Sequence, residues 1–453
     1  MQLGRILDII LKYSLFLALV LIILSGSCAK AQSAKESEKL VTERQAFRFP
    51  QQNFIHPLLS PDDKWVVYHS TEIDWSRQKL SDFLFGRIRT VCWKKIFYTK
   101  LGRSDKKLVP FFPVNEKHKD WIVGLYKKWS PDGKVLALTA EINGEEFIVL
   151  VSFSGDQPRF MESFKGSSPF FWKSKELLIY IDVYGNIAKK KPGRSPEYAV
   201  YFRSSYSGRG QTNNFQVASN GNILYNYNNN SVYMTNLANP SKKIKLFPEC
   251  EILESGFQNL KLSRRFDLSP SGEHAVFYIK EKTHNSKAMC VLIDLQALKV
   301  VDKFSVKKHS KALWSPRGTK LAYHEDTIVQ NSDDPDPSKR IWPKPHFFIL
   351  DLATGQTQDF GIRVSEEFNW TPDEKHILYS SKIINESPGY HESGIFIMRI
   401  YDGKDISKVS NISAFGYLTI SLSGKYIAWE ALNVETFFVV ENPFWEEMSE
   451  KFQ

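Results

Sequence analysis

The chain has 453 residues, of which 42% are hydrophobic and 14% aromatic, and its formal net charge is +10. This composition excludes wholesale disorder, and the length suits a closed β architecture or a repeat array better than one ordinary compact domain. Acidic residues are interspersed with the basic ones, so the charge does not indicate a nucleic-acid partner. The four cysteines include no C-x-x-C pair, which excludes a zinc ribbon and a disulfide-stapled scaffold.

The first 31 residues predict an export signal rather than a part of the fold. Arg5 and Lys12 supply the positive charge, and the apolar run over residues 13–24 has the length typical of a signal-peptide core. The run is short for a membrane-spanning helix, which needs roughly 20 apolar residues. A cleaved signal is therefore favoured over a retained anchor helix, and we expect a protein exported to the periplasm or the cell surface.

Two cleavage sites are compatible with this signal. Residues 29–31 (AKA) fit a small-residue cleavage site before Gln32. Residues 25–28 (SGSC) resemble a bacterial lipoprotein signal, in which Cys28 is the lipid-bearing first residue of the mature chain. Ser25 departs from that motif, which usually has Leu at this position. We expect lipidation at Cys28 and a membrane attachment through it, with free secretion as the alternative.

A recurring turn motif organises the remaining chain, and residues 129–138 (WSPDGKVLAL) are its clearest copy. An aromatic or apolar residue precedes Ser-Pro-Asp-Gly-Lys, and an alternating apolar strand follows. The eight copies have their turns at Ser60, Ser130, Lys173, Ala218, Ser269, Ser315, Thr371 and Ser421. After a first spacing of 70 residues, successive copies lie 43 to 56 residues apart. This is the size of a four-stranded propeller blade rather than of a solenoid unit.

The residues of the motif suit a tight turn between two strands. Pro presets φ at the first corner, Asp bonds the nearby backbone, and Gly takes the position where φ is positive. Ser130 and Asp132 recur in several copies, so we assign them to turn formation rather than to catalysis. A second apolar strand, such as residues 146–153, follows most anchors, and several units add a further short strand.

We therefore predict an all-β fold, a β-propeller of four-stranded blades over residues 47–445. Eight blades are expected, with seven as the alternative if a weak unit, at 173 or 218, is not a blade. The last unit lacks an outer strand, and residues 46–49 (AFRF) are expected to supply it and close the ring. Residues 32–46 are expected to form a tether, and residues 446–453 a C-terminal tail.

The repeats resemble those of the PD40 or TolB-like (WD40-like) β-propeller family, whose consensus is an aromatic residue, SPDGK and a short apolar strand. The turns at Ser130, Ser315 and Thr371 match it best, and those at Lys173 and Ala218 match it least. TolB itself has six blades behind a small α/β domain, for which this chain has no room. The resemblance implies a binding platform outside the cytoplasm, or a non-catalytic partner of a peptidase domain.

The sequence predicts no catalytic residues, metal site or cofactor. It contains no G-x-S-x-G nucleophile motif and no H-x-x-x-H pair.

His69 and His324 follow equivalent strands and are expected to pack normally, with a shared channel mouth as the alternative. Residues 189–194 (KKKPGR) are expected to be a solvated loop rather than a binding patch. The acidic loop over residues 331–338 is expected to be a solvated insertion rather than a calcium site.

The candidate partner-contact residues lie in the extended region after the first anchor. They are Trp75, Arg77, Phe83, Phe85 and Arg87. Loops of propellers usually carry binding, and aromatic residues with Arg are typical interface anchors. The expected function is a non-enzymatic, monomeric module of the bacterial cell envelope that binds a protein or peptide. A hydrolase or lyase with a site in the central channel and a periplasmic ligand-binding sensor are the alternatives.

Overall fold

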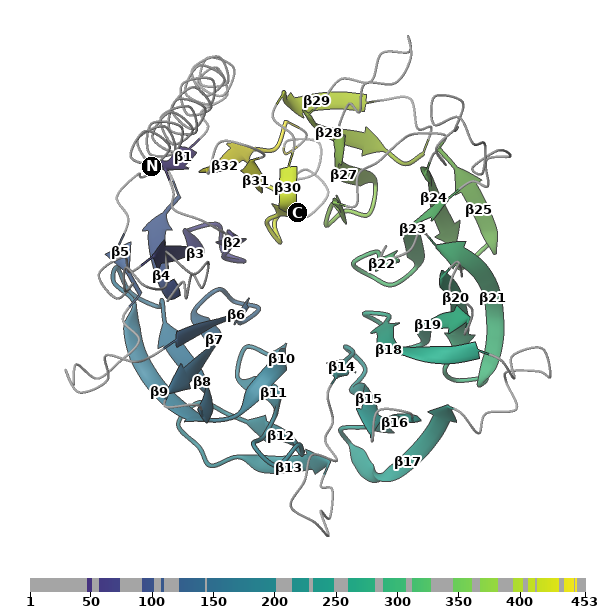
Figure 1. Cartoon of the computed structure of the whole chain (residues 1–453), viewed down its shortest axis with the longest axis horizontal. Helices are drawn as coiled ribbons and strands as arrows, with labels where there is room; N and C mark the ends of the chain where they lie inside the picture. The colour runs from purple at the N-terminus through teal and green to yellow at the C-terminus, as the bar shows by residue number, and fades with distance from the viewer. Residues whose placement is uncertain are drawn as a thin grey trace, which may run out of the picture.

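The computed structural model of the chain is an eight-bladed β-propeller. Eight sheets, each of four antiparallel strands, stand radially around a common axis (Figure 1). The structure describes residues 47–50, 57–73, 92–101, 107–109, 122–142, 145–200, 214–227, 231–247, 260–281, 288–306, 312–326, 345–360, 367–381, 394–401, 406–411, 414–431, 436–443 and 445. The prediction of an all-β propeller with eight blades is confirmed, and the weak units at 173 and 218 are both blades.

Each blade is numbered in chain order, with its innermost strand given first. Blade 1 is β2 (Leu58–Leu59), β3 (Trp65–Ile73), β4 (Cys92–Lys100) and β5 (Lys107–Leu108), and blade 2 is β6 (Ile122–Trp129), β7 (Val135–Ile142), β8 (Glu145–Ser152) and β9 (Arg159–Lys165). Blade 3 is β10 (Ser167–Ser174), β11 (Leu177–Ile181), β12 (Ile187–Lys190) and β13 (Glu197–Val200), and blade 4 is β14 (Phe215–Val217), β15 (Asn222–Tyr227), β16 (Ser231–Asn236) and β17 (Asn239–Phe247).

The second half of the ring repeats this arrangement. Blade 5 is β18 (Leu260–Leu268), β19 (His274–Glu281), β20 (Ala288–Asp294) and β21 (Lys299–Val306), and blade 6 is β22 (Leu313–Trp314), β23 (Lys320–Asp326), β24 (Pro345–Asp351) and β25 (Gln356–Asp359). Blade 7 is β26 (Phe368–Trp370), β27 (His376–Ser381), β28 (Gly394–Arg399) and β29 (Ile406–Ser410), and blade 8 is β30 (Ala414–Ile420), β31 (Tyr426–Ala431), β32 (Thr436–Glu441) and β1 (Phe47–Pro50).

The ring closes through the first strand of the chain. β1 pairs antiparallel with β32, with Phe47 opposite Val439 and Pro50 opposite Thr436. The outer strand of blade 8 therefore comes from the N-terminal end of the propeller, as predicted from the incomplete last unit. Pairing the two ends of the domain removes an exposed edge of β32 and makes closure depend on residues far apart in the sequence.

Six of the eight anchor turns start with a Ser or Thr, and the hydroxyl of this residue is a structural group. In blade 2, Ser130 Oγ donates to Asp132 Oδ1 (2.7 Å) and accepts the backbone N–H of Val135 (2.9 Å). The equivalent hydroxyl accepts the N–H five residues later in five further blades. The pairs are Ser60 with Trp65, Ser269 with His274, Ser315 with Lys320, Thr371 with His376 and Ser421 with Tyr426. The same bonds recur around the ring, so Ser130 and Asp132 fold a turn.

Replacing Ser130 with alanine is expected to lower the free energy of unfolding by about 1–3 kcal/mol, because the Val135 N–H loses its acceptor. The carboxyl of Asp132 also loses a donor. Burial raises the pKa of Asp132, but the hydrogen bonds from Ser130 and the Lys134 N–H outweigh it and hold that pKa below its usual value. Urea denaturation measures the change. Ser154→Ala, at an exposed turn, is the control, and it should change the free energy of unfolding by no more than about 0.5 kcal/mol. Equal losses of unfolding free energy in the two variants would contradict the structural role of the Ser130 hydroxyl.

The fourth residue of the turn has a positive φ, and this residue touches the neighbouring blade. Glycine occupies it in blades 2, 4, 5, 6 and 8, whereas Asp63 (φ 56°) and Glu374 (φ 59°) occupy it in blades 1 and 7. Both carboxylates reach back to the turn of the preceding blade. Ser423 Oγ donates to Asp63, and Thr319 Oγ1 donates to Glu374 Oε2 at 3.1 Å. The anchor turns of blades 1 and 7, which the sequence analysis assigned to turn formation, therefore also hold adjacent blades together.

The tryptophan of the motif makes a second kind of contact between blades. Its indole N–H donates to a backbone carbonyl on the innermost strand of the preceding blade. The bonds run from Trp129 to Leu58 (3.5 Å), Trp172 to Lys128 (3.2 Å), Trp314 to Asp267 (3.1 Å) and Trp370 to Leu313 (3.0 Å). In blades 2, 3, 6 and 7 the tryptophan that precedes the turn is therefore an inter-blade tie as well as a large apolar side chain.

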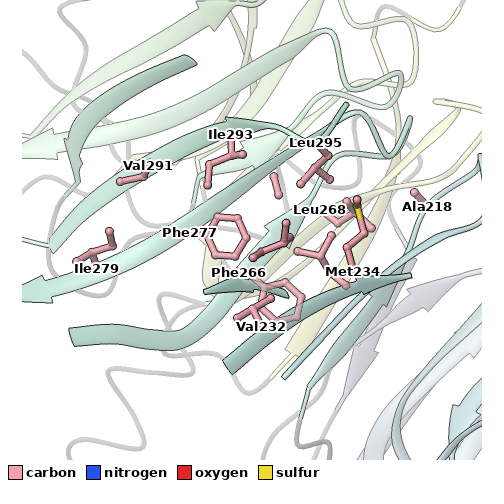
Figure 2. Packing of buried hydrophobic residues seen from close by; sticks show 13 residues of the cluster. Ala218, Val232, Met234, Phe266, Leu268, Phe277, Ile279, Val291, Ile293 and Leu295 are labelled. Carbon is pink, nitrogen blue, oxygen red and sulfur yellow. The ribbon is translucent and has the colours of Figure 1, made fainter. Parts of the chain in front are cut away.

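The hydrophobic core lies between blades rather than within one. Eight clusters of buried residues occur, one at each junction of neighbouring blades. Figure 2 shows the cluster between blades 4 and 5, where Val232 and Met234 of β16 meet Phe266 and Phe277 of blade 5. Each sheet buries apolar side chains on both of its faces, which explains why the sequences of its strands are continuous apolar runs.

One sequence expectation concerns a single cysteine of this fold. Cys290 is a buried free thiol, and burial raises its pKa, so it is the small core residue that was expected. No helix among the described residues is long and apolar enough to span a membrane. The export signal and tether over residues 1–46, with Cys28, lie outside the described residues.

Candidate binding groove between blades 6 and 7

A large hollow lies between blades 6 and 7, at the end of the propeller that carries the anchor turns. Its volume is about 1190 Å³. Blade 6 contributes β24, β25 and the connection between them, and blade 7 contributes its anchor turn and the end of β28. The lining residues are Lys320, Ile349, Asp351, Thr354, Gln356, Thr357, Gln358, Phe360, Asp373, Glu374, Lys375, His376, Arg399, Ile400 and Tyr401. We call this hollow the 6/7 groove.

Glu374 ties the two walls of the 6/7 groove together. It stands where most turns have glycine, and its side chain is nearly buried. Its carboxylate accepts hydrogen bonds from Thr319 Oγ1 and from the backbone N–H of Arg317, both on the anchor turn of blade 6. A charged carboxylate held by two donors from another blade is a strong local contact. Glu374 therefore fixes the spacing of the blades on either side of the groove.

Asp351 and Asp373 are also held by the protein itself. Asp351 lies 2.7 Å from Lys320 Nζ and accepts the N–H groups of Ala353 and Thr354. Burial raises the pKa of Asp351, but these partners outweigh it and keep that pKa below its usual value. Asp373 is similar. Burial raises its pKa, but the hydrogen bonds from His376, Thr371 and the Lys375 N–H outweigh burial and keep that pKa below its usual value.

The remaining lining residues give the 6/7 groove an apolar floor and polar lips. Ile349 is buried, and Phe360 and Ile400 are half-buried members of the cluster between blades 6 and 7. Gln356 and Gln358 are exposed on β25. Tyr401 is 89% exposed, the highest value among the large hydrophobic side chains of the described residues.

An apolar floor, polar lips and carboxylates already bonded to the protein suit recognition of a ligand rather than bond cleavage. The three carboxylates of the groove already accept bonds from protein donors, so they are fixed parts of its wall. His376 is 3% exposed and lies 3.4 Å from Asp373, beneath the surface. What the groove offers to a ligand is apolar area, side-chain amides, and the exposed Lys375 and Tyr401. Such a mixture of an apolar pocket with few placed polar groups is typical of binding sites.

A smaller hollow of about 340 Å³ lies between blades 1 and 2 at the same end of the propeller. Lys100 crosses it, with Nζ 2.9 Å from Asp156 Oδ1 and 5.3 Å from the ring centre of Trp65. Asp156 is 95% exposed, so this ion pair contributes little to stability. The hollow has less than a third of the volume of the 6/7 groove, and we regard the larger one as the candidate site.

The residues singled out from the sequence are not those of the groove. Trp75, Arg77, Phe83, Phe85 and Arg87 lie outside the described residues, so their role as partner contacts stays a prediction. The acidic loop over residues 331–338 also lies outside them. The groove residues were missed because its walls come from different repeats. The replacement of the turn glycine by Glu374 was the one signal in the sequence that marked this junction.

Two other predictions can be followed in the structure. Lys190, in the basic run, is 4% exposed and lies 2.9 Å from Glu162 Oε2, so one lysine of the expected solvated loop is buried in an ion pair. His324 is 1% exposed and packs against Phe347 and Phe368, with ring centres 5.6 and 5.0 Å away. It packs between blades 6 and 7, as expected of an ordinary buried histidine. The side chain of His69 lies outside the described residues.

Comparisons with known proteins agree with the fold. No protein-family model and no curated protein matches the sequence. The solved Dos1 propeller is similar with a TM-score of 0.53 and 9% identity, over 87% of this chain and 94% of that one. The comparison therefore supports the β-propeller fold of this chain and nothing finer.

Two further structures extend the list of similar folds. They are the oligogalacturonate lyase of Vibrio parahaemolyticus (TM-score 0.46, 10% identity, 83% of this chain and 97% of that one) and the Cps50 (Swd1) propeller domain of Myceliophteria thermophila (TM-score 0.42, 9% identity, 71% and 99%). None of these similarities indicates a function, because one fold hosts many unrelated functions. The function of this propeller must therefore be argued from its own residues.

Proposed function

We propose that this propeller is a non-enzymatic binding module that holds an extended peptide segment of a partner protein in the 6/7 groove. The observation that carries the proposal is the groove itself, about 1190 Å³ with an apolar floor and a fully projecting Tyr401 at its lip. Aromatic side chains beside apolar pockets are the residues that dominate binding energy at protein interfaces.

The rigidity of the groove supports a binding role. Glu374 links its two walls, and the carboxylates of Asp351 and Asp373 are held by donors of their own blades. A preformed site loses little conformational entropy when its ligand binds. Among the described residues, no three His, Cys, Asp or Glu side chains converge as a metal-binding or acidic catalytic cluster would. A binding module is therefore favoured over a hydrolase or lyase.

The sequence supports placing this module in the bacterial cell envelope. We propose a PD40 or TolB-like propeller, exported by the signal over residues 1–31 and attached to the membrane by a lipid on Cys28. The partner is a protein or peptide of the envelope, and its second contact region consists of Trp75, Arg77, Phe83, Phe85 and Arg87. Neither nucleic acid nor a cofactor is part of this proposal, and the propeller acts as a monomer.

Selection of ligands from a random short-peptide display library tests the groove. Peptides enriched on the intact protein should bind at least about tenfold more weakly to Tyr401→Ala, because a truncated interface tyrosine costs on the order of 1.4 kcal/mol or more. Arg399→Ala, on the same wall, should also weaken them. Tyr401 is exposed, so its truncation should leave the fold unaffected. Affinities are measured by fluorescence anisotropy.

Tyr184→Ala is the matched control for the groove experiment. Tyr184 is 68% exposed and lies on the β11–β12 hairpin of blade 3, at the opposite end of the propeller from the anchor turns. Its removal should leave peptide binding unchanged. Peptides that bind Tyr401→Ala and the unaltered protein equally would overturn the groove as the site.

Mass spectrometry of the mature protein purified from membranes tests the anchor. A diacylglycerol-modified Cys28 as the first residue is expected. A mature chain that begins with unmodified Gln32 would exclude the lipid anchor and leave free secretion.

A further inference from the structure

The outermost strand of blade 6 has an open edge beside the 6/7 groove. β25 pairs with β24 on its inner side, and among the described residues no strand pairs with its outer side (Figure 1). All four residues of β25 are exposed, whereas the outer strands β9 and β13 each contain half-buried or buried residues. An open strand edge presents main-chain N–H and C=O groups to any extended chain that approaches it.

The pairing with β24 shows which main-chain groups of β25 face outward. The N–H of Phe360 donates to the carbonyl of Phe347 (3.0 Å), which lies directly opposite it in the register. In antiparallel strands, directly opposed pairs alternate between hydrogen-bonded and non-hydrogen-bonded. Gln358, two residues before Phe360, therefore directs its main-chain groups to β24, whereas Thr357 forms a non-hydrogen-bonded pair with Leu350. The N–H and C=O of Thr357 thus point away from β24, toward the open edge.

Thr357 borders the 6/7 groove with its main chain. Side chains of a strand alternate between its two faces, and those of Gln356 and Gln358 lie on the same face as Ile349, in the cluster between blades 6 and 7. The Thr357 side chain lies on the other face, where it hydrogen-bonds with the side chain of Tyr323 in the cluster between blades 5 and 6. Since Thr357 nevertheless lines the 6/7 groove, it does so with main-chain atoms.

The charges and the floor of the groove limit what can add to this edge. The lining side chains carry three positive and three negative formal charges, with His376 counted as neutral. These are Lys320, Lys375 and Arg399 against Asp351, Asp373 and Glu374. A formal charge of zero above an apolar floor suits a segment that has no net charge and carries apolar side chains. β25 has four residues and spans about 13 Å, so a segment of about this length can pair along it.

We propose that the peptide of the partner protein adds to β25 as a fifth strand of blade 6. This inference rests on the proposed function of the 6/7 groove and states how the groove recognises its peptide. The main chain of the peptide bonds the N–H and C=O of Thr357, and every second side chain turns toward the apolar floor. Main-chain bonds give affinity that tolerates many sequences, and pockets for alternate side chains give specificity. The recognised class is therefore an uncharged segment with alternating apolar residues and no proline at the paired position.

Removing one main-chain donor of β25 tests the pairing. The probe is the tightest-binding peptide of the display selection, synthesised with blocked ends and a fluorophore. Thr357→Pro deletes the outward N–H, and proline is tolerated on an edge strand where that N–H faces outward. We expect Thr357→Pro to weaken binding of the probe at least about tenfold, because a carbonyl of the peptide loses its donor.

Thr357→Val is the matched control for this variant. It keeps the main-chain N–H and loses only the side-chain hydroxyl, so its affinity for the probe should stay within about twofold of the unaltered protein. Circular dichroism and the thermal midpoint confirm that both variants fold. Equal affinities of Thr357→Pro and Thr357→Val for the probe would overturn strand addition.

Methylation of the probe tests the same pairing without altering the protein. Each main-chain nitrogen of the peptide is methylated in turn, and fluorescence anisotropy measures the affinity of each product. In a strand that is paired along one edge, only alternate N–H groups face the neighbouring strand. Affinity should therefore fall at every second position and be retained between them. A methylation profile without this alternation would overturn strand addition.

The results separate this inference from the groove itself. Weaker binding to Tyr401→Ala together with a methylation profile without alternation would retain the groove and overturn strand addition. Equal binding of the probe to Tyr401→Ala and to the unaltered protein would overturn the groove, and strand addition with it. Sedimentation velocity tests a second copy of the chain as the occupant. A dimer of the free protein that Thr357→Pro dissociates would show that β25 pairs with its counterpart in another copy, and would also overturn the proposal.

Discussion

Replacing Gly272 with alanine is expected to lower the free energy of unfolding by about 3 kcal/mol. The residue has φ 79°, a region that disfavours residues with a Cβ by roughly 1–2 kcal/mol. An added Cβ would also lie 2.6 Å from Ala218 Cβ and still closer to Asn220, both in the turn of blade 4. Neither the turn nor its partner can yield without separating the blades, so overpacking adds about 1–3 kcal/mol. Urea denaturation measures the loss.

Gly193→Ala separates the two contributions to this loss. Gly193 has a similar φ of 73°, but nothing lies within 4 Å of an added Cβ. Its replacement should cost only the backbone contribution, about 1 kcal/mol. A difference of about 2 kcal/mol between the two variants would measure the contact between the turns of blades 4 and 5. Equal losses would show that the turn of blade 5 does not press on blade 4.

Replacing Lys127 with phenylalanine is expected to stabilise the propeller at pH 7, on the order of 2 kcal/mol. A pKa lowered from 10.5 to about 7 corresponds to a cost of up to ~5 kcal/mol for carrying the lysine in the folded state. Relaxation of the surroundings reduces this figure, as it does for buried ions in general. Lys127 lies three residues before the first turn residue of its blade, and a phenylalanine lies there in blades 3, 4, 5 and 7 (Phe170, Phe215, Phe266 and Phe368), so its ring suits the site.

The stabilisation should depend on pH in a defined direction. Above about pH 10.4 the lysine is neutral in both the folded and the unfolded chain, and it carries no charge-related cost. As pH falls toward 7, the unfolded chain gains the proton and the folded one does not, so stability is lost through this window. The cost is complete below the folded pKa of about 7.

The gain from Lys127→Phe should therefore be greatest at pH 6–7 and shrink toward pH 9.5. Thermal or urea unfolding over this range measures it. Lys134→Phe is the control, because Lys134 is exposed and its replacement should change stability little at any pH. A gain at position 127 that is the same at pH 6.5 and pH 9.5 would show that the amine is not desolvated in the folded protein.

The anchor turns show how far the sequence predicts this fold. The Ser-Pro-Asp-Gly pattern specifies a local hydrogen-bonded turn, and turns of this kind depend on residues close in the chain. Their number and spacing therefore predicted eight blades of four strands, and the missing outer strand of the last unit predicted the role of β1. The hydrogen bond from the Val135 N–H to the Ser130 hydroxyl was not predicted, although it too joins residues close in the chain.

The contacts between blades did not follow from that pattern. Trp370 was recognised as a repeat residue, but its bond to Leu313 joins residues 57 positions apart. Glu374 was visible as a departure from glycine, but only the structure shows that it accepts bonds from blade 6. In a ring, every junction is made by residues from two repeats, and the sequence of one repeat does not state which groups of the next will face it.

The sequence by itself determined the repeat, the blade size, the number of blades and the closure of the ring, because each depends on local turn chemistry and on strand periodicity. The tertiary structure alone decided the 6/7 groove and the place of Lys127. A groove between blades depends on how two sheets pack, and the exception at Lys127 appears only when innermost strands are compared through their partners. The environment of a side chain depends on which elements pack around it, and the order of residues in the chain does not specify that packing.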